Sequence, residues 1–94
     1  MNFVFHPEAE FYGAIKHYES CATGVGDEFA LEIYVTIQGI LARPRAWPLL
    51  APEVRRCLVS RFPFGVLYSI EPDRIFILSV MHLHRKPEYW MQRK

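Results

Sequence analysis

The chain has 94 residues, of which 51% are hydrophobic, 15% aromatic and 22% charged. This length favours a single domain over residues 1–94, and this composition excludes a disordered chain and a membrane span. Two cysteines, Cys21 and Cys57, lack the spacing of a metal site, and the first residues lack the basic and apolar regions of a secretory signal. We therefore expect a cytoplasmic protein without a membrane partner.

The net charge of +1 conceals two halves of opposite charge. Residues 1–42 carry one base and six acids, which gives −5, whereas residues 43–94 carry ten bases and four acids, which gives +6. The basic half could bind an anionic partner. Alternatively, the two halves complement each other within one fold.

The first half of the chain predicts a short strand and two helices. Asn2 to Phe5 can supply the strand, and Pro7 suits the first turn of a helix over residues 7–20. The apolar stripe of this helix is Phe11, Ile15, Tyr18 and Ala22. After a turn at residues 24–26, a second helix is indicated by the helical spacing of Phe29, Ile33, Ile37, Ile40 and Leu41. It must end near Ala42 or Arg43, because Pro44 cannot continue it.

The second half predicts a loop and a β-meander. Residues 43–52 contain three prolines and are expected to connect the helices to the sheet without forming a strand. Three runs rich in β-branched and aromatic residues follow, at 54–61, 64–70 and 75–81, with turn residues between them. The expected fold is therefore α+β, with an N-terminal strand and a helical hairpin packed on one face of an antiparallel sheet. The other face would be partly open.

Few residues suggest catalytic chemistry. His82 and His84 would share a face of the last strand, but two ligands do not make a metal site. His82 could instead act as a general acid or base beside Arg85. The Gly24-Val25-Gly26 segment lacks the lysine and third glycine of phosphate-binding loops and is interpreted as a turn. We expect neither a metal nor a cofactor.

Most basic residues of the second half are arginines. The planar guanidinium group of arginine suits the recognition of phosphate or carboxylate groups. Tyr89 and Trp90 follow Arg85 closely and could stack on nucleic-acid bases. Alternatively, these aromatic residues pack on the core and the arginines pair with glutamates of the helices. The residues that we expect to contact a partner or target are Arg55, Arg56, Arg61, Arg85, Tyr89, Trp90 and Arg93.

The order of these features resembles the RelE/ParE superfamily of toxins from type II toxin–antitoxin systems, including the plasmid-stabilisation type. The similarity covers nearly the whole chain. It rests on the helical hairpin with its glycine turn, the loop with Pro44 and Trp47-Pro48, and the segments 54–68 and 77–90. The resemblance implies a helical hairpin on a curved antiparallel sheet, growth inhibition, and an antitoxin that folds around the toxin.

The superfamily divides by target. The RelE-like branch consists of ribosome-dependent mRNA endoribonucleases, and a similar site here would use Arg56, Arg61, Arg85 and Tyr89, with His82 as a further candidate. Leu58 and Gly65, however, stand where these enzymes often carry bases. Fewer charges would then stabilise a developing phosphorane.

The ParE-like branch inhibits DNA gyrase, and its last strand commonly ends in an apolar run followed by His and then Arg. Val80-Met81-His82 with Arg85 is similar to this pattern. We favour gyrase inhibition because it accounts for His82 and for the missing bases. The endoribonuclease and a non-toxic nucleic-acid-binding relative are the alternatives.

Overall fold

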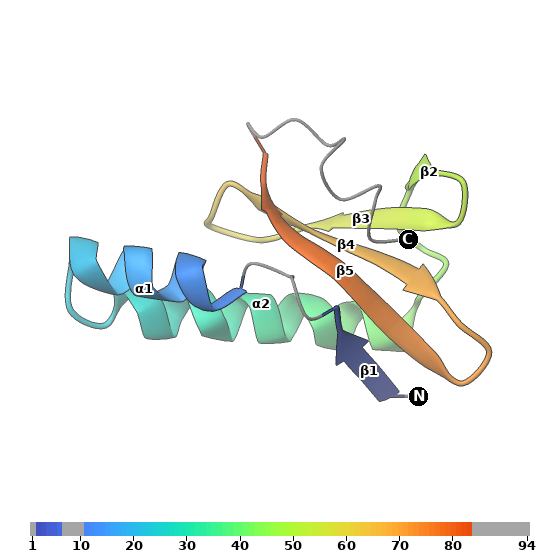
Figure 1. Ribbon diagram of the computed structural model, residues 1–94, viewed down its shortest axis with the longest axis horizontal. Helices are drawn as coiled ribbons and strands as arrows, with labels where there is room; N and C mark the ends of the chain where they lie inside the picture. Colours follow the sequence, from blue (N-terminus) through green and yellow to red (C-terminus); the bar gives the residue numbers. More distant parts are fainter. Residues whose placement is uncertain (1, 7–10, 84–94) are drawn as a thin grey trace.

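The computed structural model describes residues 2–6 and 11–83 and places two helices against one five-stranded sheet (Figure 1). The elements are β1 (Asn2–Phe5), α1 (Phe11–Cys21), α2 (Val25–Ala42), β2 (Leu49–Ala51), β3 (Val54–Leu58), β4 (Phe64–Ile70) and β5 (Arg74–His82). The strand order is β1-β5-β4-β3-β2. Only β1 pairs in parallel, with β5, so the sheet is mixed and not wholly antiparallel as predicted. The predicted α+β class, N-terminal strand and meander are confirmed.

A tight glycine turn joins α1 to α2. Gly24 has a φ of 88°, a conformation that glycine adopts at little cost. The carboxylate of Glu19 accepts hydrogen bonds from the backbone N–H groups of Gly24 and Gly26, each at 3.1 Å. These amides at the start of α2 thus have hydrogen-bond partners within the hairpin. The segment forms a turn, as predicted.

The helical hairpin covers one face of the sheet. On α2, the predicted residues Phe29, Ile33, Ile37 and Ile40 are buried and Leu41 packs beside them. Phe11, Ile15 and Tyr18 of α1 contact the same cluster, but Ala22 lies beyond the end of α1 and is exposed, so its predicted place in the stripe was wrong. Neither described helix is long and apolar enough to cross a membrane.

The opposite face of the sheet carries a second apolar cluster. Its buried members are Val54, Leu67, Leu78 and Met81, with Leu50, Ala51 and Phe76 packed beside them. The sequence predicted a partly open face, yet Leu67 and Leu78 are fully buried. The central strands β4 and β5 are therefore buried on both faces, which explains their nearly continuous apolar sequences.

Two predicted boundaries were wrong. Residues 49–51, expected in a loop, form β2 and pair with β3 across an irregular register. This strand lies at the sheet edge, where Pro48 and Pro52 on either side of it are tolerated. The strand predicted to reach Arg61 ends at Leu58, and Arg61 has a φ of 71°, which a ladder strand does not accommodate. Residues 7–10 of the predicted first helix lie outside the described residues.

The close approach of α1 and α2 at Gly26 leads to a prediction about the stability of the fold. A Cβ on Gly26 would lie 2.8 Å from the backbone oxygen of Ile15, whereas a Cβ on Gly13 would meet nothing within 4 Å. We expect Gly26→Ala to lower the free energy of unfolding by about 1–3 kcal/mol because the helices must separate. Gly13→Ala, the matched control, should raise it by about 0.5–1 kcal/mol. Urea unfolding measures both, and a Gly26→Ala protein as stable as the parent would contradict the predicted helix contact.

Candidate functional site

The alternation of β3 sends its two adjacent arginines to opposite faces of the sheet. Arg55 pairs with Tyr68, which belongs to the cluster under the helices, and Arg56 pairs with Leu67, which belongs to the second cluster. Successive side chains of a strand point to opposite faces. Arg55 therefore lies on the helical side, and Arg56 on the other.

Arg56 lies across a glycine of the neighbouring strand. A Cβ on Gly65 would be 3.0 Å from Cγ and 3.1 Å from Cδ of Arg56, and 3.6 Å from Leu83. The bare backbone of Gly65 thus leaves room for the aliphatic part of Arg56. Leu58 shares this face by alternation and is exposed. Arg56 is therefore the one described arginine of the predicted cleavage set on this face.

Arg61 faces the helices instead. Its guanidinium lies 3.3 Å from the carboxylate of Glu28 and 3.9 Å from that of Glu32, both on α2. It also lies 6.0 Å from the ring centre of Phe62. Exposed ion pairs of this kind contribute about 0–1 kcal/mol to stability. The alternative expectation, that the arginines pair with glutamates of the helices, is therefore correct for Arg61. The structure does not bring Arg61 and Arg56 together.

His82 ends β5 on the helical side of the sheet. It pairs with Phe64, and the two rings meet edge to face with centroids 5.1 Å apart. The ring is partly buried at this contact. The described residues contain no group of three or more His, Cys, Asp or Glu side chains placed to hold a metal ion. His84, the second histidine of the predicted pair, lies outside them.

The remaining predicted site residues are Arg85, Tyr89, Trp90 and Arg93, and they too lie outside the described residues. Their proposed contacts with an antitoxin or target stay predictions. The described part of the site therefore consists of Arg55, Arg56, Arg61 and His82, divided between two faces of the sheet.

Arg55 fixes the loop that follows α2, a role that the sequence did not indicate. Its Nη1 donates hydrogen bonds to the backbone oxygens of Trp47 at 2.6 Å and Arg45 at 3.3 Å. Beside it, the hydroxyl of Tyr68 donates to the backbone oxygen of Pro44 at 2.6 Å. Two facing residues of β3 and β4 thus hold consecutive parts of one loop. The proline content alone predicted the loop but could not reveal these long-range contacts.

Two titratable groups near this loop are unsuited to chemistry at neutral pH. Burial raises the pKa of the Cys57 thiol to about 11 and that of the Tyr68 hydroxyl to about 12. Both side chains belong to the cluster under the helices. Cys57 is therefore a protonated core residue and not a nucleophile, since the thiolate is the reactive form.

These raised pKa values predict a loss of stability at alkaline pH. The ordinary values are near 9 for Cys57 and 10 for Tyr68, so the unfolded chain releases these protons first. Because the unfolded state then binds fewer protons, the contribution of these two groups to the free energy of unfolding should be constant below about pH 8 and fall as the pH rises toward 12. Urea unfolding at several pH values measures this slope. Tyr68→Phe should reduce the slope above about pH 10, and an unchanged slope would contradict the assignment.

The described chain is thus a small α+β domain whose helical hairpin covers one face of a mixed sheet and whose strands carry arginines toward both faces. Neither a protein-family model nor a curated protein matches the sequence. Among solved structures, the chain is similar to a chain from the chromosomal ParDE toxin–antitoxin system of P. aeruginosa, with a TM-score of 0.62 and 20% identity. The similarity covers 89% of this chain and 97% of that one, and it confirms the predicted fold.

Proposed function

We propose that this protein is the toxin of a type II toxin–antitoxin pair and is neutralised by a cognate antitoxin. The observation that carries the proposal is the similarity of fold, over nearly the whole of both chains, to a chain from a ParDE toxin–antitoxin system. The superfamily resemblance of the sequence supports the same function independently of that structure.

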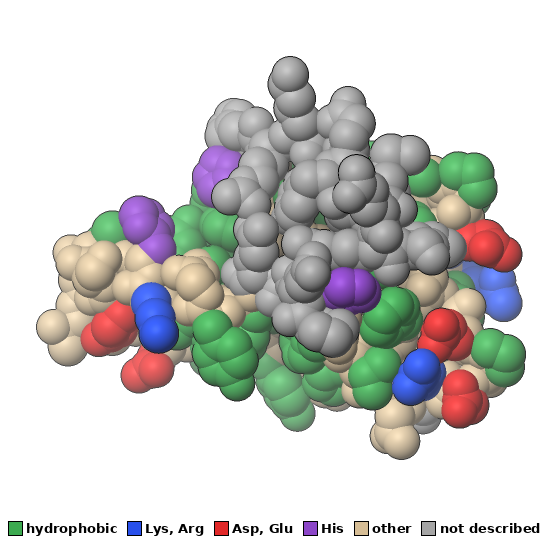
Figure 2. All heavy atoms as spheres, viewed as in Figure 1, with side chains coloured by type: hydrophobic (Ala, Val, Ile, Leu, Met, Phe, Trp, Pro, Cys, Tyr) green, Lys and Arg blue, Asp and Glu red, His purple; other side chains and the backbone are tan. Residues whose placement is uncertain are grey.

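The outer surface of α2 supports a protein partner. Leu31, Tyr34 and Val35 are exposed to 62%, 56% and 55%, and their spacing places them together, away from the buried stripe of the helix. We call these three residues the α2 patch. Figure 2 shows hydrophobic side chains along the lower margin of the molecule, where α2 runs. Contiguous exposed apolar side chains are typical of interaction sites.

Gyrase inhibition is the target activity that we favour. An endoribonuclease must direct several charges at one phosphate, because stabilisation of a phosphorane depends on groups that converge on it. Arg56 and Arg61 face opposite sides of the sheet, and Leu58 and Gly65 supply no charge beside Arg56. This separation supports ParE-like inhibition of DNA gyrase over cleavage of mRNA.

Two assays in parallel test the target. We expect the purified protein to inhibit DNA supercoiling by gyrase and to accumulate cleaved DNA, while mRNA stays intact in a cell-free translation reaction. Trp90→Ala, at a residue outside the described ranges, should abolish the gyrase effect, whereas Arg74→Ala, at an exposed residue of β5, should not.

Ribosome-dependent cutting of mRNA would overturn the choice of gyrase. If that cutting is lost in Arg56→Ala, Arg61→Ala and Arg85→Ala, the protein is a RelE-like endoribonuclease. If neither assay responds and expression leaves growth unchanged, the protein is a non-toxic relative.

The antitoxin is tested with the protein encoded beside this gene. We expect a complex by size-exclusion chromatography and calorimetry, with a negative heat-capacity change from coupled folding. Tyr34→Ala in the α2 patch should weaken binding about tenfold or more, because buried tyrosines often dominate interface energies. Tyr12→Ala, at an exposed tyrosine of α1 outside the patch, is the matched control and should change affinity less than about threefold. Equal affinities for the two variants would remove the α2 patch from the interface.

A further inference from the structure

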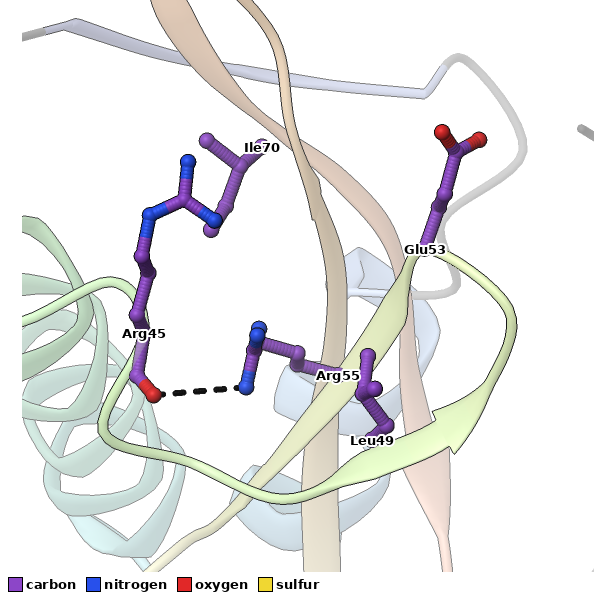
Figure 3. A pocket seen from close by; sticks show the side chains of 5 residues that line it. All are labelled: Arg45, Leu49, Glu53, Arg55 and Ile70. Carbon is purple, nitrogen blue, oxygen red and sulfur yellow. Dashed lines mark hydrogen bonds between the residues drawn. The ribbon is translucent and has the colours of Figure 1, made fainter.

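A cavity of about 330 Å³ lies between the loop after α2 and the edge of the sheet. It is lined by Arg45, Leu49, Glu53, Arg55 and Ile70 (Figure 3). We call it the Arg45–Arg55 pocket. Among the described residues, the arginines in ion pairs are Arg61 and Arg74. Two guanidinium groups therefore line this pocket without a described carboxylate partner.

Arg55 is held in place before any ligand binds. The two hydrogen bonds to the carbonyls of Arg45 and Trp47 both come from Nη1, so no described contact uses Nε or Nη2. A guanidinium has five N–H donors in a fixed plane. Because the strand and the loop already fix this side chain, Arg55 would lose little conformational entropy when a ligand binds to its remaining donors.

The side chains of Arg45 and Arg55 give their part of the pocket wall a positive charge. Figure 3 shows Arg45 extending past Ile70 on one side and Arg55 reaching toward the same loop, while Glu53 directs its carboxylate away from both. Arg45 is exposed and forms no described side-chain hydrogen bond. Two guanidinium groups that line one cavity attract an anion, and each can bind it through charge-assisted hydrogen bonds.

The walls of the pocket favour a peptide over a nucleic acid. Leu49 is 59% exposed at the edge strand β2, and Ile70 is partly buried on the other side. These residues offer apolar contact directly beside the arginines. Single-stranded nucleic acids usually require aromatic rings for base stacking, and among the described residues that line the cavity none is aromatic.

We propose that the Arg45–Arg55 pocket binds an aspartate or glutamate side chain of a partner peptide, with a neighbouring apolar side chain of that peptide against Leu49 and Ile70. The inference rests on the proposed function, since the partner is then the antitoxin. It adds to that function a defined carboxylate-binding site at the β2 edge of the sheet, separate from the α2 patch.

Calorimetry with the protein encoded beside this gene tests the pocket. Arg45→Gln removes an exposed charge and should weaken binding about tenfold or more. Arg55→Lys retains the charge but loses the planar fork, and should weaken binding by a similar factor. Arg74→Gln removes the same charge outside the pocket and should change affinity less than about twofold. Circular dichroism of each variant verifies that it is folded.

The possible outcomes distinguish a failure of the pocket proposal from a failure of the proposed function. If the wild-type complex forms and Arg45→Gln binds equally well, the pocket is overturned and the proposed function stands. If no complex forms with the wild-type protein, both are overturned. A 20-nucleotide RNA is titrated in parallel, and RNA binding that Arg45→Gln abolishes while antitoxin binding persists would make the pocket a nucleic-acid site. Restored affinity between Arg45→Glu and a partner carrying an acidic-to-lysine change would identify the carboxylate.

Discussion

The packing of α2 against the sheet is the interaction on which the rest of the structure depends. Phe29, Ile33, Ile37 and Ile40 lie against a sheet whose two central strands are also buried on the opposite face. Burial on both faces leaves almost no room for charge on these strands, since an unpaired buried charge is strongly unfavourable. Within the sheet, charged side chains are therefore confined to β3 and to Arg74 at the start of β5.

This confinement explains why the arginines do not form one site. On β3, alternation alone separates Arg55 from Arg56, and the backbone turn at Arg61 directs that side chain toward α2. Each arginine then has a different role: Arg55 holds a loop, Arg56 lies across Gly65, and Arg61 pairs with the acidic helix. The opposite charges of the two halves of the chain thus meet at Arg61, whereas Arg45 and Arg55 have no described acidic partner.

Much of the fold could be predicted from local patterns. The apolar spacing of α2, the glycine turn and the runs that became β4 and β5 are all short-range signals, and each was confirmed. The failures were at positions where the local signal was weak or misleading. Residues 49–51 form a strand because an edge tolerates the flanking prolines, and the strand ends before Arg61 because of one left-handed residue. Ala22 followed the helical spacing but lies past the helix end.

The sequence by itself determined the α+β class, the two amphipathic helices, the meander and the identities of the basic residues, because periodicity and turn chemistry depend on neighbours in the chain. Only the tertiary structure decided which arginines share a face, that Tyr68 and Arg55 hold the loop after α2, and that Arg45 and Arg55 line one pocket. Those relations depend on strand register and on contacts between residues distant in sequence. A shift of one residue in the register would exchange the two faces, and no local pattern specifies it fully.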